Sequence, residues 1–230
     1  AHADDGPRAR PAHHNPVVHW NTVAGAAFAP TEGTNPMAQS RTFAILHVAI
    51  HDALNAIDRR YESYLPALPA APSASADAAV AAAAREVLLT LLPEQAVLVE
   101  AEYARTLSAT REGPAKAAGI ATGRAAAWAI LNHRQGDGAD TAAQPAYVPG
   151  SGPGEYQFTP PFDFAAQPGW GNVRPFVIEL QEHAVEGPHA LASEQYARDF
   201  AYVKDIGHAA STTRTPEQSE IARFWYEDSP

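Results

Sequence analysis

The chain has 230 residues, a formal net charge of −10 and no cysteine. The lack of cysteine excludes a disulfide scaffold, a thiolate metal site and a cysteine nucleophile. The acidic balance argues against nucleic acid as a partner, because little in the chain would neutralise phosphates. No apolar run reaches the roughly 18 residues needed to span a bilayer, so we expect no membrane partner. Alanine supplies much of the 46% hydrophobic content, which favours closely packed helices over sheet.

The N-terminal segment 1–16 is rich in proline, histidine and arginine, and we predict that it forms a flexible tail. Its first three residues, Ala1-His2-Ala3, are similar to the small-x-small end of a signal-peptide cleavage site. We therefore expect an exported protein, periplasmic or extracellular, from which a signal peptide has been removed. A plain disordered terminus would have nearly the same sequence.

The first strong helical pattern runs from about Met37 to Arg60, and it predicts a mostly buried helix. Its apolar residues recur at helical spacing: Phe43, Leu46, Ile50, Leu54 and Ile57. A second helix is predicted to begin near Ser75. Pro93 suits the first turn of a further helix better than the interior of a continuous one. The buried stripe of that further helix is predicted to be Val97, Leu98, Ala101, Ala104 and Leu107.

The next helix is predicted from Pro114 to about His133, with Ile120, Trp128 and Leu131 facing inward. Gly119 and Gly123 lie four residues apart in it and would let a neighbouring helix approach closely.

From Gly136 to about Pro188 the helical pattern gives way to prolines, glycines and aromatic residues. The aromatic residues argue against free disorder, so we predict an ordered segment that lies across the helices. At its start, Gly136-Asp137-Gly138-Ala139-Asp140 is similar to part of a calcium loop but lacks the later glutamate, and a turn after a helix explains it better.

Two further helices are predicted near the C-terminal end of the sequence. Ser193 is a good N-cap for the first, whose apolar face is Tyr196, Phe200, Val203 and Ile206. The second has Thr215 as N-cap, Pro216 as its first residue and Gln218 to complete a capping box, with Ile221, Phe224 and Trp225 predicted to face inward. The whole pattern predicts an all-α fold, a multi-helix bundle with a long ordered loop rich in proline, glycine and aromatic residues.

His47 and His51 are the candidate metal ligands of this sequence. They lie four residues apart, so a helix places both imidazoles on one face. No third ligand follows at a diagnostic spacing, and Val48 stands where a zinc-protease helix would have its glutamate. The alternative is a buried polar seam, in which these histidines hydrogen-bond to neighbouring helices or to a second domain.

Three stretches carry a resemblance to a known family: residues 40–58, Trp170-Gly171-Asn172-Val173-Arg174-Pro175-Phe176, and 211–225. They resemble the first helix, the central loop and the segment before the catalytic half of bacterial proteins related to vanadium-dependent haloperoxidases and type 2 phosphatidic acid phosphatases. The order and rough spacing match, and the resemblance covers nearly the whole chain after the tail.

The resemblance implies that residues 17–230 are the N-terminal helical half of such a protein. The family binds vanadate or phosphate through a Lys…Arg-Pro motif, a Pro-Ser-Gly-His motif and a Ser-Arg…His motif. No Pro-Ser-Gly-His occurs in the 230 residues, and Lys204 is followed by Asp205-Ile206-Gly207-His208, which is not the anion-binding pattern. We therefore assign no catalytic or cofactor-binding residue here, and we expect vanadate to bind only in the complete protein. The expected partner is the missing C-terminal catalytic half, from the same gene or as a separate chain, or a second copy in a homo-oligomer.

The complete protein would then oxidise halides with peroxide or hydrolyse phosphate esters. One alternative is a non-catalytic helical binding or structural protein that retains only this half. A second alternative is a metal-dependent hydrolase that uses His47 and His51.

Overall fold

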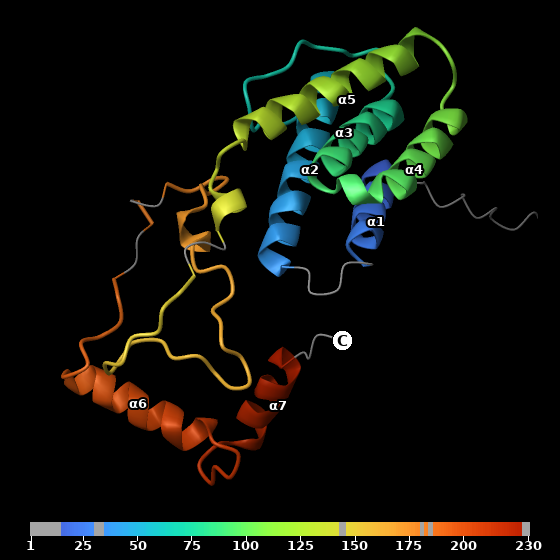
Figure 1. The fold of residues 1–230 in the computed structure, drawn as a ribbon. Helices are drawn as coiled ribbons and strands as arrows, with labels where there is room; N and C mark the ends of the chain where they lie inside the picture. The colour runs from blue at the N-terminus through green and yellow to red at the C-terminus, as the bar shows by residue number, and fades with distance from the viewer. Residues whose placement is uncertain (1–14, 30–34, 143–145, 180–181, 184–185, 227–230) are drawn as a thin grey trace, which may run out of the picture. The chain divides into compact units, whose positions relative to one another are not determined.

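The computed structural model describes residues 15–29, 35–142, 146–179, 182–183 and 186–226. Every regular element within these residues is a helix, so the predicted all-α class is confirmed (Figure 1). The chain separates into two compact units, residues 1–139 and 140–230. Each unit is described below by itself.

Five α-helices and one short 3-10 helix make up the first unit: α1 (Pro16–Phe28), α2 (Pro36–Ile57), α3 (Ala76–Leu91), η1 (Pro93–Gln95), α4 (Ala96–Ala109) and α5 (Pro114–His133). The predicted starts are confirmed at three of them. The hydroxyl of Ser75 accepts a hydrogen bond from the backbone N–H of Ala78, Pro93 opens η1 ahead of α4, and Pro114 is the first residue of α5.

Helix α1 was not predicted, because the first strong helical pattern in the sequence begins at about Met37. The local signals are present: the side-chain oxygen of Asn15 accepts from the N–H groups of Val17 and Val18, and Pro16 occupies the first turn. Trp20 is fully buried and is the largest residue on the buried side of α1. Residues 1–14 of the predicted tail lie outside the described residues.

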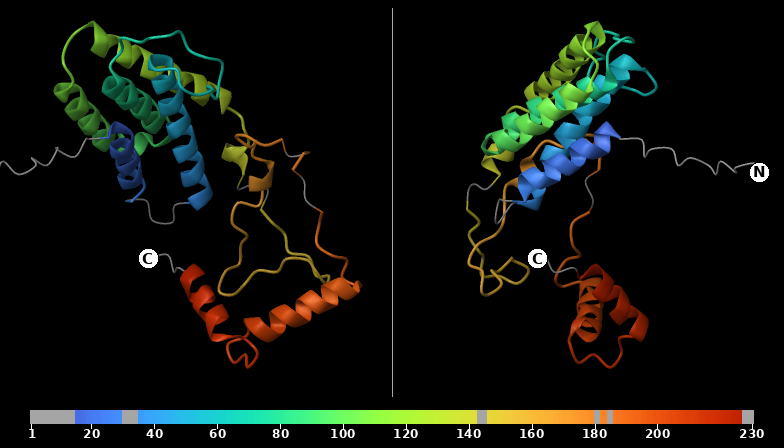
Figure 2. Two further views of the ribbon diagram at one scale, coloured as in Figure 1. Left: turned by 180° about the vertical axis from the view of Figure 1, so that it is seen from behind. Right: turned by 90° about the vertical axis from the view of Figure 1, so that its right-hand side faces the viewer.

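Helix α3 is the centre of the first unit, since it packs against α1, α2, α4 and α5 (Figure 2). Its alanines from Ala78 to Ala84 are almost completely buried. Such small side chains let the neighbouring helices come close on several sides at once, and this is how an alanine-rich sequence forms a dense core.

Helices α3 and α5 approach each other closely at Gly119 and Gly123, as the spacing of these two glycines predicted. A Cβ atom on Gly119 would stand 2.4 Å from the carbonyl oxygen of Ser75, and one on Gly123 would stand 2.1 Å from that of Ala79. These glycines therefore lie directly against the α3 backbone.

Two predicted helix faces are wrong. In α4, Val97 is 87% exposed and Val99 is the buried residue, and in α5, Trp128 is 50% exposed while Ala126, Ala127 and Ile130 are buried. The small residues that pack on α3 decide the orientation of α5, whereas the prediction gave most weight to the largest apolar side chain.

The second unit contains η3 (Trp170–Asn172), α6 (Glu194–Gly207) and α7 (Pro216–Trp225), and η2 (Ala139–Thr141) lies at the border between the units. The predicted caps are confirmed: Ser193 caps α6, and Thr215 and Gln218 form the capping box of α7. In the loop before α6, the rings of Tyr147, Tyr156 and Phe158 contact one another edge to face.

The inward orientation predicted for the last two helices is not observed within the described residues. Neither α6 nor α7 has a buried residue. Phe200 and Val203 of α6, and Ile221, Phe224 and Trp225 of α7, are exposed. An amphipathic pattern identifies the apolar face of a helix, but it does not show which other part of a protein covers that face.

Candidate functional site

The polar stripe predicted on α2 runs through His47, His51, Asn55 and Asp58, with Asp52 adjacent. Asp58 is exposed and pairs with Arg60, so the α2 stripe below means His47, His51, Asp52 and Asn55. Asp52 and Asn55 are buried and the histidines are half-buried. Successive turns of the helix bring His47, His51 and Asn55 to one side, and Asp52 follows His51 directly in the sequence. Their contacts lead to two different places, helix α1 and the loop that follows α2.

His47 binds helix α1. Its Nε2 donates to the side-chain oxygen of Asn21 across 2.9 Å, and its ring stacks on Phe43 with 6.4 Å between the ring centroids. Burial lowers the pKa of His47 below its ordinary value of 6.5. The imidazole is therefore neutral near pH 7 and carries its proton on Nε2.

The other three residues hold the loop after α2. Nε2 of His51 donates to the carbonyl oxygen of Glu62 across 3.0 Å. The carboxylate of Asp52 accepts from the N–H groups of Tyr64 and Leu65, at 2.9 and 3.2 Å. The Asn55 amide oxygen accepts from the N–H groups of Arg60 and Tyr61, and its nitrogen donates to the Tyr61 carbonyl and the Ser63 hydroxyl, so this side chain makes four hydrogen bonds.

The Asn55→Ala variant is expected to release this loop. Losing all four hydrogen bonds leaves the N–H groups of Arg60 and Tyr61 without their side-chain acceptor, so their amide hydrogens should exchange at least about tenfold faster, which corresponds to ~1.4 kcal/mol. Hydrogen exchange followed by NMR measures this directly. Asn55→Asp is the matched control, since it keeps the acceptor oxygen and should protect both amides better than alanine does. Equal exchange in the wild type and Asn55→Ala would contradict the assignment.

His47 is expected to make the first unit less stable as the pH falls. Its pKa is lowered in the folded state, so the unfolded chain binds a proton first, and stability present above about pH 6.5 is lost as the pH falls toward the folded pKa. The measurement is urea denaturation of the wild type and His47→Gln between pH 5 and 7.5. The free energy of unfolding of the wild type relative to His47→Gln should decrease on acidification, and a constant difference would show that His47 does not titrate in this range.

Chelation of a metal through the Nε2 atoms of His47 and His51 would displace two hydrogen bonds, because each Nε2 is used by a protein acceptor in a different part of the unit. Among the residues that the structure describes, no group of three or more His, Cys, Asp or Glu side chains could hold a metal ion. The metal site remains a prediction, while the alternative of a polar seam matches the contacts of the stripe.

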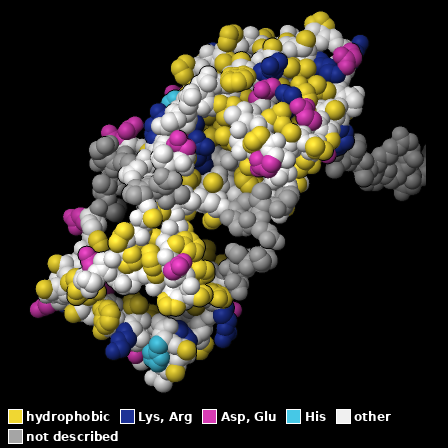
Figure 3. Space-filling model, viewed as in Figure 1, with side chains coloured by type: hydrophobic (Ala, Val, Ile, Leu, Met, Phe, Trp, Pro, Cys, Tyr) yellow, Lys and Arg dark blue, Asp and Glu magenta, His cyan; other side chains and the backbone are white. Residues whose placement is uncertain are grey.

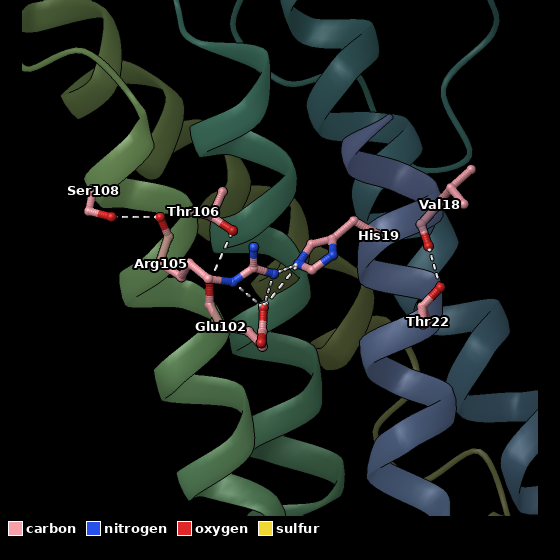
Figure 4. A network of polar contacts seen from close by, with 7 residues as sticks. All are labelled: Val18, His19, Thr22, Glu102, Arg105, Thr106 and Ser108. Carbon is pink, nitrogen blue, oxygen red and sulfur yellow. Dashed lines mark hydrogen bonds and ion pairs between the residues drawn. The ribbon is translucent and has the colours of Figure 1, made fainter. Parts of the chain in front are cut away.

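A second polar network joins α1 to α4 (Figure 4). Nε2 of His19 lies 3.2 Å from the carboxylate of Glu102 and 3.2 Å from the guanidinium of Arg105, which itself pairs with Glu102. The nearby hydroxyls of Thr106 and Ser108 donate to backbone carbonyls of their own helix. The contacts of His19 hold α1 against α4.

The most buried charges of the first unit lie at the end of α5. The carboxylate of Asp137 accepts from Nε of Arg41 and from Nε of Arg134, both at 2.9 Å, and from the N–H of Ala139. The side chains of Arg134 and Asp137 are only 1% and 2% exposed. Burial acts to raise the pKa of Asp137, but the hydrogen bonds from Arg41, Ala139 and Arg134 outweigh it and lower the pKa overall.

The role of Asp137 was not predicted, because the sequence around it indicates only a turn. The turn is confirmed, with Gly136 and Gly138 at φ +63° and +97° on either side of the aspartate. Arg41 lies 96 residues away in the sequence, so no local pattern could have joined it to Asp137.

In the second unit, Arg214 fixes the corner between α6 and α7. Its Nη1 donates to the carbonyl oxygens of Ile206 and His208 at the end of α6, and its Nε donates to the hydroxyl of Ser219 in α7. A cation at the C-terminal end of a helix also interacts favourably with the helix dipole. The two helices are therefore held at a defined angle although neither contains a buried residue.

Comparison of the chain with models of known families, with curated proteins and with solved structures finds no match. No helix within the described ranges is both long enough and apolar enough to cross a membrane.

Proposed function

We propose that this chain is the helical N-terminal part of an enzyme of the vanadium-dependent haloperoxidase and acid phosphatase type, and that its role is to support the catalytic helical bundle. The complete protein would oxidise halides with peroxide or hydrolyse phosphate esters, using residues outside positions 1–230. The first unit is the folded support, and the α6–α7 corner is the part that docks on the bundle.

The observation that carries the proposal is the uncovered apolar face of α7. Phe224, Trp225 and Tyr226 are each more than 75% exposed, and Ile221 is 50% exposed. Hydrophobic side chains are visible on the surface of the second unit in Figure 3. Contiguous aromatic surface of this kind is typical of an interface. This helix lies within residues 211–225, one of the stretches that resemble the family.

The contacts of the α2 stripe support a non-catalytic role for this part. The side chains of His47, His51, Asp52 and Asn55 make hydrogen bonds that hold α1 and the loop after α2, which is a structural use of the stripe. A supporting domain needs such internal polar contacts to keep its shape.

The test is to express the reading frame beyond Pro230 and to compare the longer product with the 230-residue chain. We expect a longer native product in which the amides of α7 are protected from hydrogen exchange. We also expect halide oxidation with added vanadate and peroxide, or phosphate-ester hydrolysis, from the longer product alone. A native product of 24.4 kDa, or a longer product with α7 unprotected, would overturn the proposal.

A further inference from the structure

We draw no further inference here: the strongest candidate, the pocket that Arg214 and Arg223 line at the corner of α6 and α7, carries nothing because acidic and basic side chains nearly balance in residues 193–226 and nothing in the structure shows what covers it.

Discussion

Replacing Asp137 with alanine is expected to lower the free energy of unfolding of the first unit by about 3–5 kcal/mol, the range found when one member of a buried ion pair is removed. The carboxylate lies between Arg41 and Arg134, and its side chain is 2% exposed. Without it, two guanidinium groups remain close together in a place that excludes water. The loss of stability comes from the uncompensated positive charge of the two arginines. It therefore exceeds the net contribution that the ion pair makes to stability.

Urea denaturation followed by circular dichroism measures this loss. Asp58→Ala is the matched control, because Asp58 also pairs with an arginine, Arg60, but their side chains are 60% and 71% exposed. An exposed pair contributes little to stability because water and salt screen it. If Asp137→Ala lost no more stability than Asp58→Ala, the buried cluster would not be holding the end of α5.

The pH dependence of the same variant provides a second check. The folded pKa of Asp137 is lowered, so its contribution to stability is present above its unfolded pKa of about 3.9 and is lost as the pH falls through the folded pKa. The difference in unfolding free energy between the wild type and Asp137→Ala should therefore shrink on acidification below about pH 4.

The starts of most helices could be predicted because their signals are local. Thr215, Pro216 and Gln218 specify the first turn of α7 through their own hydrogen bonds and the fixed φ of proline. The same reasoning located Ser75 and Pro114. Helix α1 carries equivalent signals at Asn15 and Pro16, but they adjoin a segment whose composition indicates a tail.

The buried faces were harder to predict because alanine removes the contrast on which hydrophobic periodicity depends. Helix α3 buries alanines at successive positions, so its sequence identifies no single face. In α5, Ala126 and Ala127 are buried while Trp128 is half exposed. A large apolar residue is a good guide to the core only when its neighbours are polar.

The candidate site was predictable as a stripe but not as a set of contacts. Helical spacing alone places His47 and His51 on one face of α2. The partners that decide their chemistry are Asn21 on another helix and the carbonyl of Glu62 in a loop. These pairings depend on tertiary packing, which no spacing within α2 encodes.

The substitution Gly123→Ala is expected to lower the free energy of unfolding of the first unit by about 3 kcal/mol, the upper part of the range for overpacking a core. The added Cβ would stand 2.1 Å from the carbonyl oxygen of Ala79 and 2.9 Å from the backbone nitrogen of Ala83. Both atoms belong to the α3 backbone, so no side chain can rotate away. The two helices would have to separate along their closest contact.

Gly25→Ala is the matched control, because Gly25 lies in α1 and nothing stands within 4 Å of its added Cβ. There the substitution should raise stability by up to about 1 kcal/mol, since alanine favours helix over glycine. The same chemical change is therefore expected to raise the free energy of unfolding at one position and to lower it at the other. Urea denaturation of both variants measures these two changes. A small gain at both positions would mean that α3 and α5 do not touch through their backbones.

Gly119→Ala distinguishes a local clash from a general need for small residues along α5. Its Cβ would stand 2.4 Å from the carbonyl oxygen of Ser75, at the first turn of α3. Helix ends move more easily than helix interiors, so this variant should lose less stability than Gly123→Ala. Because both glycines serve the same helix pair, separation forced by one substitution makes room for the other, and the double variant should lose less than the sum of the two single losses.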